Sequence, residues 1–159
     1  MAAPAFNVQQ FDYGKSRAQL TYLNAHVAVA CAHFIGTYTV DDLVFLRMTP
    51  PPGALELSIT NDLPEIGTAM TVLWCDRGFQ CIKEARVSRV QPQDHSFALF
   101  LGWSAPEDVA GISGALCWDG VNATGIATGV QRDSKTAHLW VQQIDPEFAN
   151  RVSNTLSVA

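Results

Sequence analysis

The chain has 159 residues, of which 48% are apolar and 16% charged, and it carries a formal net charge of −5. This balance is typical of a globular protein and argues against a disordered chain, while the length allows one domain or two small lobes. The acidic charge and the absence of basic runs argue against nucleic acid as a partner. Because no stretch approaches the roughly 20 apolar residues that span a bilayer, we expect no membrane partner.

Short apolar or alternating runs recur along the chain, and clusters of glycine, proline, asparagine and aspartate separate them. Such runs predict β-strands, and many short strands with frequent turns predict an antiparallel barrel or sandwich. The predicted strands are residues 19–23, 27–30, 43–48, 69–74, 82–90, 97–101, 125–130 and 137–141.

A proline-rich tract at residues 50–53 marks the sharpest change in composition. We interpret it and the turn-rich residues that follow as the connection between two β lobes, residues 1–60 and residues 61–159. At the C-terminus, Asp145 and Pro146 predict a helix start. The expected fold is therefore all-β with one C-terminal helix, whose apolar face carries Phe148, Val152 and Leu156.

The four cysteines permit either disulfides or a zinc site with four thiolate ligands. Their spacing lacks the closely spaced pairs that are typical of such zinc sites, and nothing indicates an oxidising compartment. We therefore expect buried free thiols and no metal. The cysteines are Cys31, Cys75, Cys81 and Cys117.

The most specific local pattern is Gly111-Ile112-Ser113-Gly114, which leads into an apolar stretch. A serine on a glycine-rich turn suits an acyl-transfer nucleophile, because glycine lets the backbone expose the hydroxyl. Glycine also lets neighbouring N–H groups point at one spot, as an oxyanion hole requires. The same tetrapeptide also fits an ordinary hairpin turn, so the interpretation depends on a base elsewhere in the chain.

A serine nucleophile needs a histidine to take its proton. His33 follows two short predicted strands and the small residues Cys31-Ala32, a pattern that resembles the first hairpin of chymotrypsin-like proteases. The alternative for His33 is a half-buried histidine at a strand end, and His26 at the hairpin turn is our second candidate. Asp42, with Asp41 as the alternative, precedes an apolar strand and looks like the acid-bearing segment of that family. A solvated turn would also explain both aspartates.

His33, Asp42 and Ser113 thus stand in the chain order of chymotrypsin-like proteases. The flanking segments resemble the compact viral members, namely the calicivirus and picornavirus cysteine proteases and the alphavirus capsid serine protease. The resemblance covers about residues 19–141. It implies a two-lobed antiparallel β-barrel with a reduced N-terminal lobe.

The resemblance further implies a serine endopeptidase that cleaves the junctions of a viral polyprotein in the cytoplasm of an infected host cell. Ser113 would attack the scissile carbonyl, His33 would take its proton and Asp42 would hold the imidazole. The N–H groups of Gly111 and Ser113 would form the oxyanion hole, no cofactor is expected, and the oligomeric state is left open. The expected substrate-binding residues are Glu107, Ala127, Thr128 and Gly129.

Three departures from the family pattern matter. The interval between His33 and Asp42 is far shorter than usual, and it requires that the two flanking strands form one hairpin with its open edge at these residues. Ile112 replaces the aspartate that often precedes the nucleophile, which suggests that zymogen activation is absent. Ala127 stands where many viral enzymes carry a glutamine-binding histidine, so a glutamine requirement is not supported. Glu107 or Asp108 could instead select a basic residue, although a solvated loop also explains them.

A different class of function also fits the sequence. A degenerate protease lobe would keep the strands, lose the triad and serve as a peptide- or protein-binding module, and the short interval between His33 and Asp42 favours that alternative. A structural protein that cleaves itself once is a third interpretation. The predicted C-terminal helix argues mildly against it, because the tail of such a protein should lie in the substrate groove.

Overall fold

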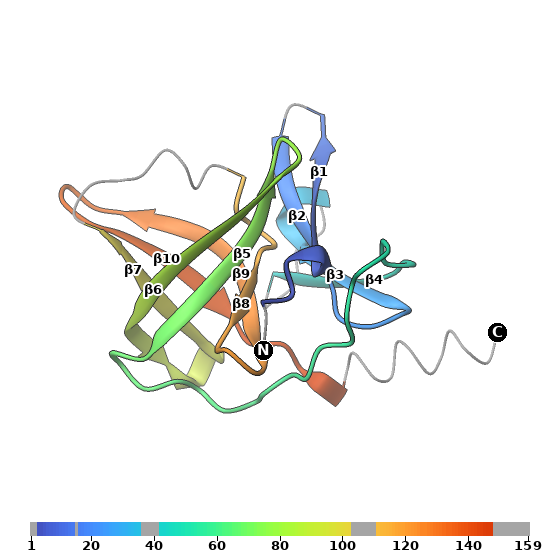
Figure 1. Cartoon of the computed structure of the whole chain (residues 1–159). Helices are drawn as coiled ribbons and strands as arrows, with labels where there is room; N and C mark the ends of the chain where they lie inside the picture. Colours follow the sequence, from blue (N-terminus) through green and yellow to red (C-terminus); the bar gives the residue numbers. More distant parts are fainter. Residues whose placement is uncertain (1–2, 15, 36–41, 103–110, 148–159) are drawn as a thin grey trace.

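The structure is a computed structural model in which residues 3–14, 16–35, 42–102 and 111–147 are described, without the side chains of residues 13 and 35. These ranges contain two antiparallel sheets that pack side by side (Figure 1). The strands are β1 (Val8–Tyr13), β2 (Ser16–Tyr22), β3 (Val27–Cys31), β4 (Leu43–Arg47), β5 (Ala69–Asp76), β6 (Phe79–Gln91), β7 (Ser96–Gly102), β8 (Leu116–Trp118), β9 (Ala123–Arg132) and β10 (Ala137–Gln142). Three short 3-10 helices accompany them: η1 (Ala5–Asn7), η2 (Ala32–Ile35) and η3 (Pro92–Asp94).

The N-terminal sheet has the strand order β1-β2-β3-β4. Its central strand β3 is buried on both faces, which explains why its sequence is an unbroken apolar run rather than an alternating one. Val27, Val29 and Cys31 face the barrel, whereas Ala28 and Ala30 pack on the opposite face of the sheet. The open sheet confirms the expectation of a reduced first lobe.

The remaining strands form a closed barrel in the order β10-β7-β6-β5-β8-β9. Alternate residues of β5, namely Met70, Val72 and Trp74, point into its core. A second apolar cluster joins the barrel to the N-terminal sheet, and it includes Leu23 and Val27 together with Leu73, Leu116 and Ile126. The two sheets therefore share buried apolar surface, which fixes their relative positions.

The structure confirms the all-β class and the barrel, and each of the eight predicted strands is present. Two further strands lie outside those eight ranges. β8 is the apolar stretch that follows the Ser113 turn, and β1 was not predicted because its sequence Val-Gln-Gln-Phe-Asp-Tyr has no clean alternation of apolar and polar residues. The proline-rich tract lies in the connection between β4 and β5, and the division at residue 60 remains a prediction. The predicted C-terminal helix falls mostly on residues 148–159, outside the described ranges. None of the described helices has the length and hydropathy needed to cross a membrane.

Candidate active site

His33 lies where the chain leaves the buried strand β3 and enters η2. Its side chain is 36% exposed, and the ring packs against Phe34 with 4.6 Å between ring centroids. Its Nδ1 atom contacts Oδ2 of Asp42. This contact orients the ring and leaves its other nitrogen, Nε2, available to form a hydrogen bond with a second group. His26, the second candidate, lies exposed at the other end of β3, where its N–H donates to Asn24 Oδ1.

Asp42 immediately precedes β4, and three interactions tie it to the end of β3. Its Oδ1 accepts the His33 N–H at 2.8 Å, and its carbonyl accepts the Ala32 N–H at 2.8 Å. Asp42 has a φ of +58°, a left-handed conformation that aspartate tolerates at a cost of about 1 kcal/mol. β3 and β4 pair antiparallel with Cys31 opposite Leu43, so they form the hairpin that the short interval required. Asp41 lies outside the described residues.

Ser113 lies on the turn formed by residues 111–115, immediately before β8, and it is half-buried. Gly111 and Gly114 have φ angles of +79° and +94°. Glycine adopts such left-handed conformations at little steric cost, which allows this turn to form. Ser113 Oγ donates to the carbonyl of Thr128 on β9 at 3.3 Å. Within the described residues it has no hydrogen bond to His33. The N–H groups of Gly111 and Ser113 also have no acceptor in the described part of the chain, as groups awaiting an oxyanion must.

Cys31 lies between the two halves of this site. Its thiol is fully buried and donates to the Ala127 carbonyl at 3.2 Å, and Gly114 donates to that carbonyl at 2.7 Å. Possible ligand atoms of Cys31, His33 and Asp42 lie within 4.8 Å of one another. Burial, followed by the Asp42 charge, raises the pKa of the Cys31 thiol well above its usual value. A metal ion would need the thiolate and would compete for the His33–Asp42 pair, so these residues fit a metal poorly.

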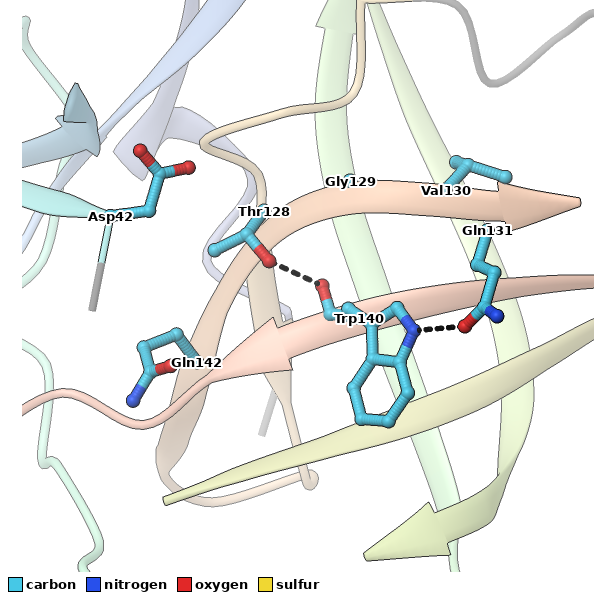
Figure 2. A pocket seen from close by; sticks show the side chains of 7 residues that line it. All are labelled: Asp42, Thr128, Gly129, Val130, Gln131, Trp140 and Gln142. Atoms are coloured by element: carbon cyan, nitrogen blue, oxygen red, sulfur yellow. Dashed lines mark hydrogen bonds between the residues drawn. The ribbon is translucent and has the colours of Figure 1, made fainter. Parts of the chain in front are cut away.

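The expected substrate-binding residues differ in accessibility. Ala127 is fully buried, and its N–H and carbonyl groups are both bonded within the protein. Thr128 and Gly129 are half-buried and line an open depression of about 430 Å³ that also reaches Asp42 and Trp140 (Figure 2). Glu107 and Asp108 lie outside the described residues.

Sequence reasoning missed three residues near the site. Trp140 forms part of the depression, where its Nε1 donates to Gln131 Oε1 at 2.8 Å. Gln19 and Thr21 are buried polar side chains on β2, and both donate to the turn that carries Ser113. The available signal was two polar residues at i and i+2 in the otherwise apolar residues 18–23, because polar side chains that become buried need specific partners.

The expectation of four buried thiols needs a correction. Cys31 and Cys117 are buried, but Cys75 and Cys81 are half-buried, because they lie toward the tip of the β5–β6 hairpin. All four are free.

No family model and no curated protein sequence matches the chain. Solved structures do match it. An inactive serine-to-alanine mutant of Rv3671c from M. tuberculosis superposes with a TM-score of 0.66 and 14% identity, covering 97% of this chain and 86% of that one. The serine protease of a human pathogenic astrovirus superposes with a TM-score of 0.62 and 15% identity, covering 92% of this chain and 94% of that one. Kallikrein-related peptidase 10 superposes with a TM-score of 0.66 and 10% identity, covering 99% of this chain and 98% of that one.

The chain has the chymotrypsin-like fold. The comparison structures include bacterial and viral proteins, and at these identities they establish the fold alone. Along this chain, the His33–Asp42 pair precedes the Ser113 turn.

Proposed function

We propose that this protein is a serine endopeptidase in which Ser113 is the nucleophile, His33 the general base and Asp42 the residue that orients the base. The observation that carries the proposal is the His33–Asp42 pair. One oxygen of the Asp42 carboxylate contacts the ring, and the other accepts the His33 backbone N–H. Together they hold a partly exposed imidazole at the connected end of the β3–β4 hairpin. A surface histidine with no catalytic role does not need this double restraint.

The mechanism is acyl transfer. Ser113 Oγ attacks the scissile carbonyl while His33 Nε2 takes its proton, and His33 then protonates the leaving amine. A water molecule hydrolyses the acyl-enzyme by the same route in reverse. Before it attacks, Ser113 Oγ gives up its bond to Thr128 O, which costs about 1 kcal/mol. The N–H groups of Gly111 and Ser113 receive the oxyanion, and each such donor contributes about 3–4 kcal/mol.

The substrate would be an extended polypeptide that pairs with β9 beside Thr128 and Gly129. The viral resemblance and the similarity to an astrovirus protease support polyprotein junctions as the natural substrate and the host cytoplasm as the setting. Glu107, on the segment before the nucleophile turn, remains our candidate for contact with the residue that precedes the cleaved bond. We assign no metal or organic cofactor to the reaction.

A catalytically silent peptide-binding module is the second candidate. The bond from Ser113 Oγ to Thr128 O, rather than to His33, favours it. Such a module would keep the pairing edge of β9 and would bind extended peptides without cleaving them.

Incubation with a library of peptides, followed by mass spectrometry of the new termini, separates the two functions. Matched variants are Ser113→Ala, His33→Ala and, as a control, Ser88→Ala. Ser88 Oγ lies 2.9 Å from His138 Nδ1 and so forms a Ser–His hydrogen bond between β6 and β10. A protease yields new termini with the wild type and Ser88→Ala and none with the other two variants. If the folded wild type binds peptides of the library and produces no new termini, the silent module is established instead.

A further inference from the structure

The side chain of Gln19 is an amide buried at the meeting point of three segments. It is 1% exposed and lies on β2. Its Nε2 donates to the carbonyls of Cys75 at 2.8 Å and of Gly111 at 2.9 Å, and its Oε1 accepts the Cys75 N–H at 2.8 Å. One side chain therefore binds β5 and the turn that carries Ser113 to the N-terminal sheet.

The carbonyl groups of this turn are all occupied. Those of residues 111, 113 and 114 accept from Gln19 Nε2, the Gln19 backbone N–H and Thr21 Oγ1. Those of residues 112 and 115 accept from the N–H groups of Ala115 and Ala127. With each carbonyl fixed, the peptide planes of the turn cannot rotate freely. The N–H groups of Gly111 and Ser113 thus stay without acceptors among the residues that the structure describes.

The Gly111 carbonyl is the one that most needs an external restraint. Gly111 has a φ of +79°, and glycine can rotate its peptide at little steric cost. The Gly111–Ile112 peptide plane, which carries this carbonyl, lies between the planes that carry the Gly111 and Ser113 N–H groups. A rotation of this middle plane about its flanking bonds would change the angle between the two donors, so that they would no longer point at one spot. The donated bond from Gln19 opposes this rotation.

We propose that Gln19 is a positioning residue that holds the Ser113 turn in the orientation that binds an oxyanion. The inference rests on the proposed function. Gln19 touches no reacting atom and acts through the Gly111 carbonyl. Since removal of a complete oxyanion donor lowers turnover by about 10²- to 10³-fold, loss of this restraint should slow acylation by at least about tenfold.

Asn7 provides a matched control. Its amide is also fully buried and donates to two carbonyls, those of Tyr22 at 2.7 Å and Leu55 at 2.6 Å, while it accepts the Leu55 N–H at 2.9 Å. Asn7→Leu and Gln19→Leu thus each remove two donated hydrogen bonds and one accepted hydrogen bond. Only Gln19→Leu removes a bond to the Ser113 turn. Gln19→Met is a further variant that keeps the length of the side chain and removes its hydrogen bonds without burying a charge.

The test measures the rate at which a fluorophosphonate probe labels Ser113, together with hydrogen exchange of residues 111–115, in the wild type and these variants. We expect Gln19→Leu and Gln19→Met to label at least about tenfold more slowly than Asn7→Leu and to exchange faster in the turn. Normal wild-type labelling with equal rates in the Gln19 and Asn7 variants would overturn this inference alone. A folded wild type that is not labelled would overturn the proposed function, and the inference with it. If Gln19→Leu fails to fold, Gln19→Met, which is closer in shape to glutamine, decides the comparison.

Discussion

Gly114 carries the tightest steric limit in the Ser113 turn. A Cβ atom built on it would lie 2.1 Å from the Gln19 carbonyl oxygen and 2.9 Å from the carbonyl carbon. Both are backbone atoms of a paired strand, so no side-chain rotation can relieve the overlap. In Gly114→Ala, the turn must therefore move away from β2 by about 1 Å or more to restore an ordinary contact distance.

The cost of that movement follows from the bonds it breaks. Three hydrogen bonds join β2 to the turn, from Gln19 N, Gln19 Nε2 and Thr21 Oγ1. At about 1 kcal/mol each they contribute about 3 kcal/mol. The left-handed φ of +94° adds about 1–2 kcal/mol for any residue with a side chain. Gly114→Ala should therefore lower the free energy of unfolding by about 4–5 kcal/mol, a large part of the stability of a domain of this size.

Gly67 separates the steric cost from the conformational one. It has the same φ of +94°, and a Cβ atom there would meet nothing within 4 Å. Urea denaturation of the wild type, Gly114→Ala and Gly67→Ala should show a loss of only about 1–2 kcal/mol for Gly67→Ala. Equal losses in the two variants would refute the reasoning that β2 and the Ser113 turn are in forced contact.

Three further predictions concern single groups. Asp42→Asn should keep the fold and lower kcat for peptide cleavage by about 10⁴-fold, and an unchanged kcat would remove Asp42 from the mechanism. Iodoacetamide at neutral pH should modify Cys75 and Cys81 and spare the other two thiols, whose pKa values are raised by burial; peptide mapping checks this. Hydrogen bonds, first of all from the Thr136 hydroxyl, lower the pKa of Asp133 from 3.8 to about 2. Because this pKa is depressed in the folded state, the stabilisation is present above about pH 4 and is lost as the pH falls through 2. Unfolding of Thr136→Val should accordingly differ from wild type at neutral pH and converge with it near pH 2, and a constant difference would contradict the assignment.

Local patterns carried most of the fold prediction. The apolar strands from β2 to β10 have strong periods or unbroken apolar runs, and strand length and turn residues separate them. The β3–β4 hairpin was the condition under which the short interval could bring His33 and Asp42 together, and the antiparallel pairing of β3 with β4 meets that condition. The Ser113 turn was predicted from its glycines, which the structure places at positive φ.

The parts that were not predicted depend on contacts between residues far apart in the chain. Gln19 is hydrogen-bonded to Gly111, which lies 92 residues away in the sequence, and to Cys75, which lies 56 residues away. No local periodicity in the sequence encodes such pairs. β1 has a mixed polar sequence and is recognisable mainly through its pairing with β2. Trp140 belongs to the depression beside Asp42 only because β10 lies next to β9 in the closed barrel.

The central claim is that Ser113 is an activated nucleophile and that His33 is its base. The most direct measurement treats the wild type, His33→Ala and Ser88→Ala with a fluorophosphonate probe and identifies the modified residue by mass spectrometry. We predict modification of Ser113 in the wild type and in Ser88→Ala, and none in His33→Ala. A folded wild-type protein that remains unmodified at Ser113, or one in which labelling of Ser113 persists without His33, would contradict the claim.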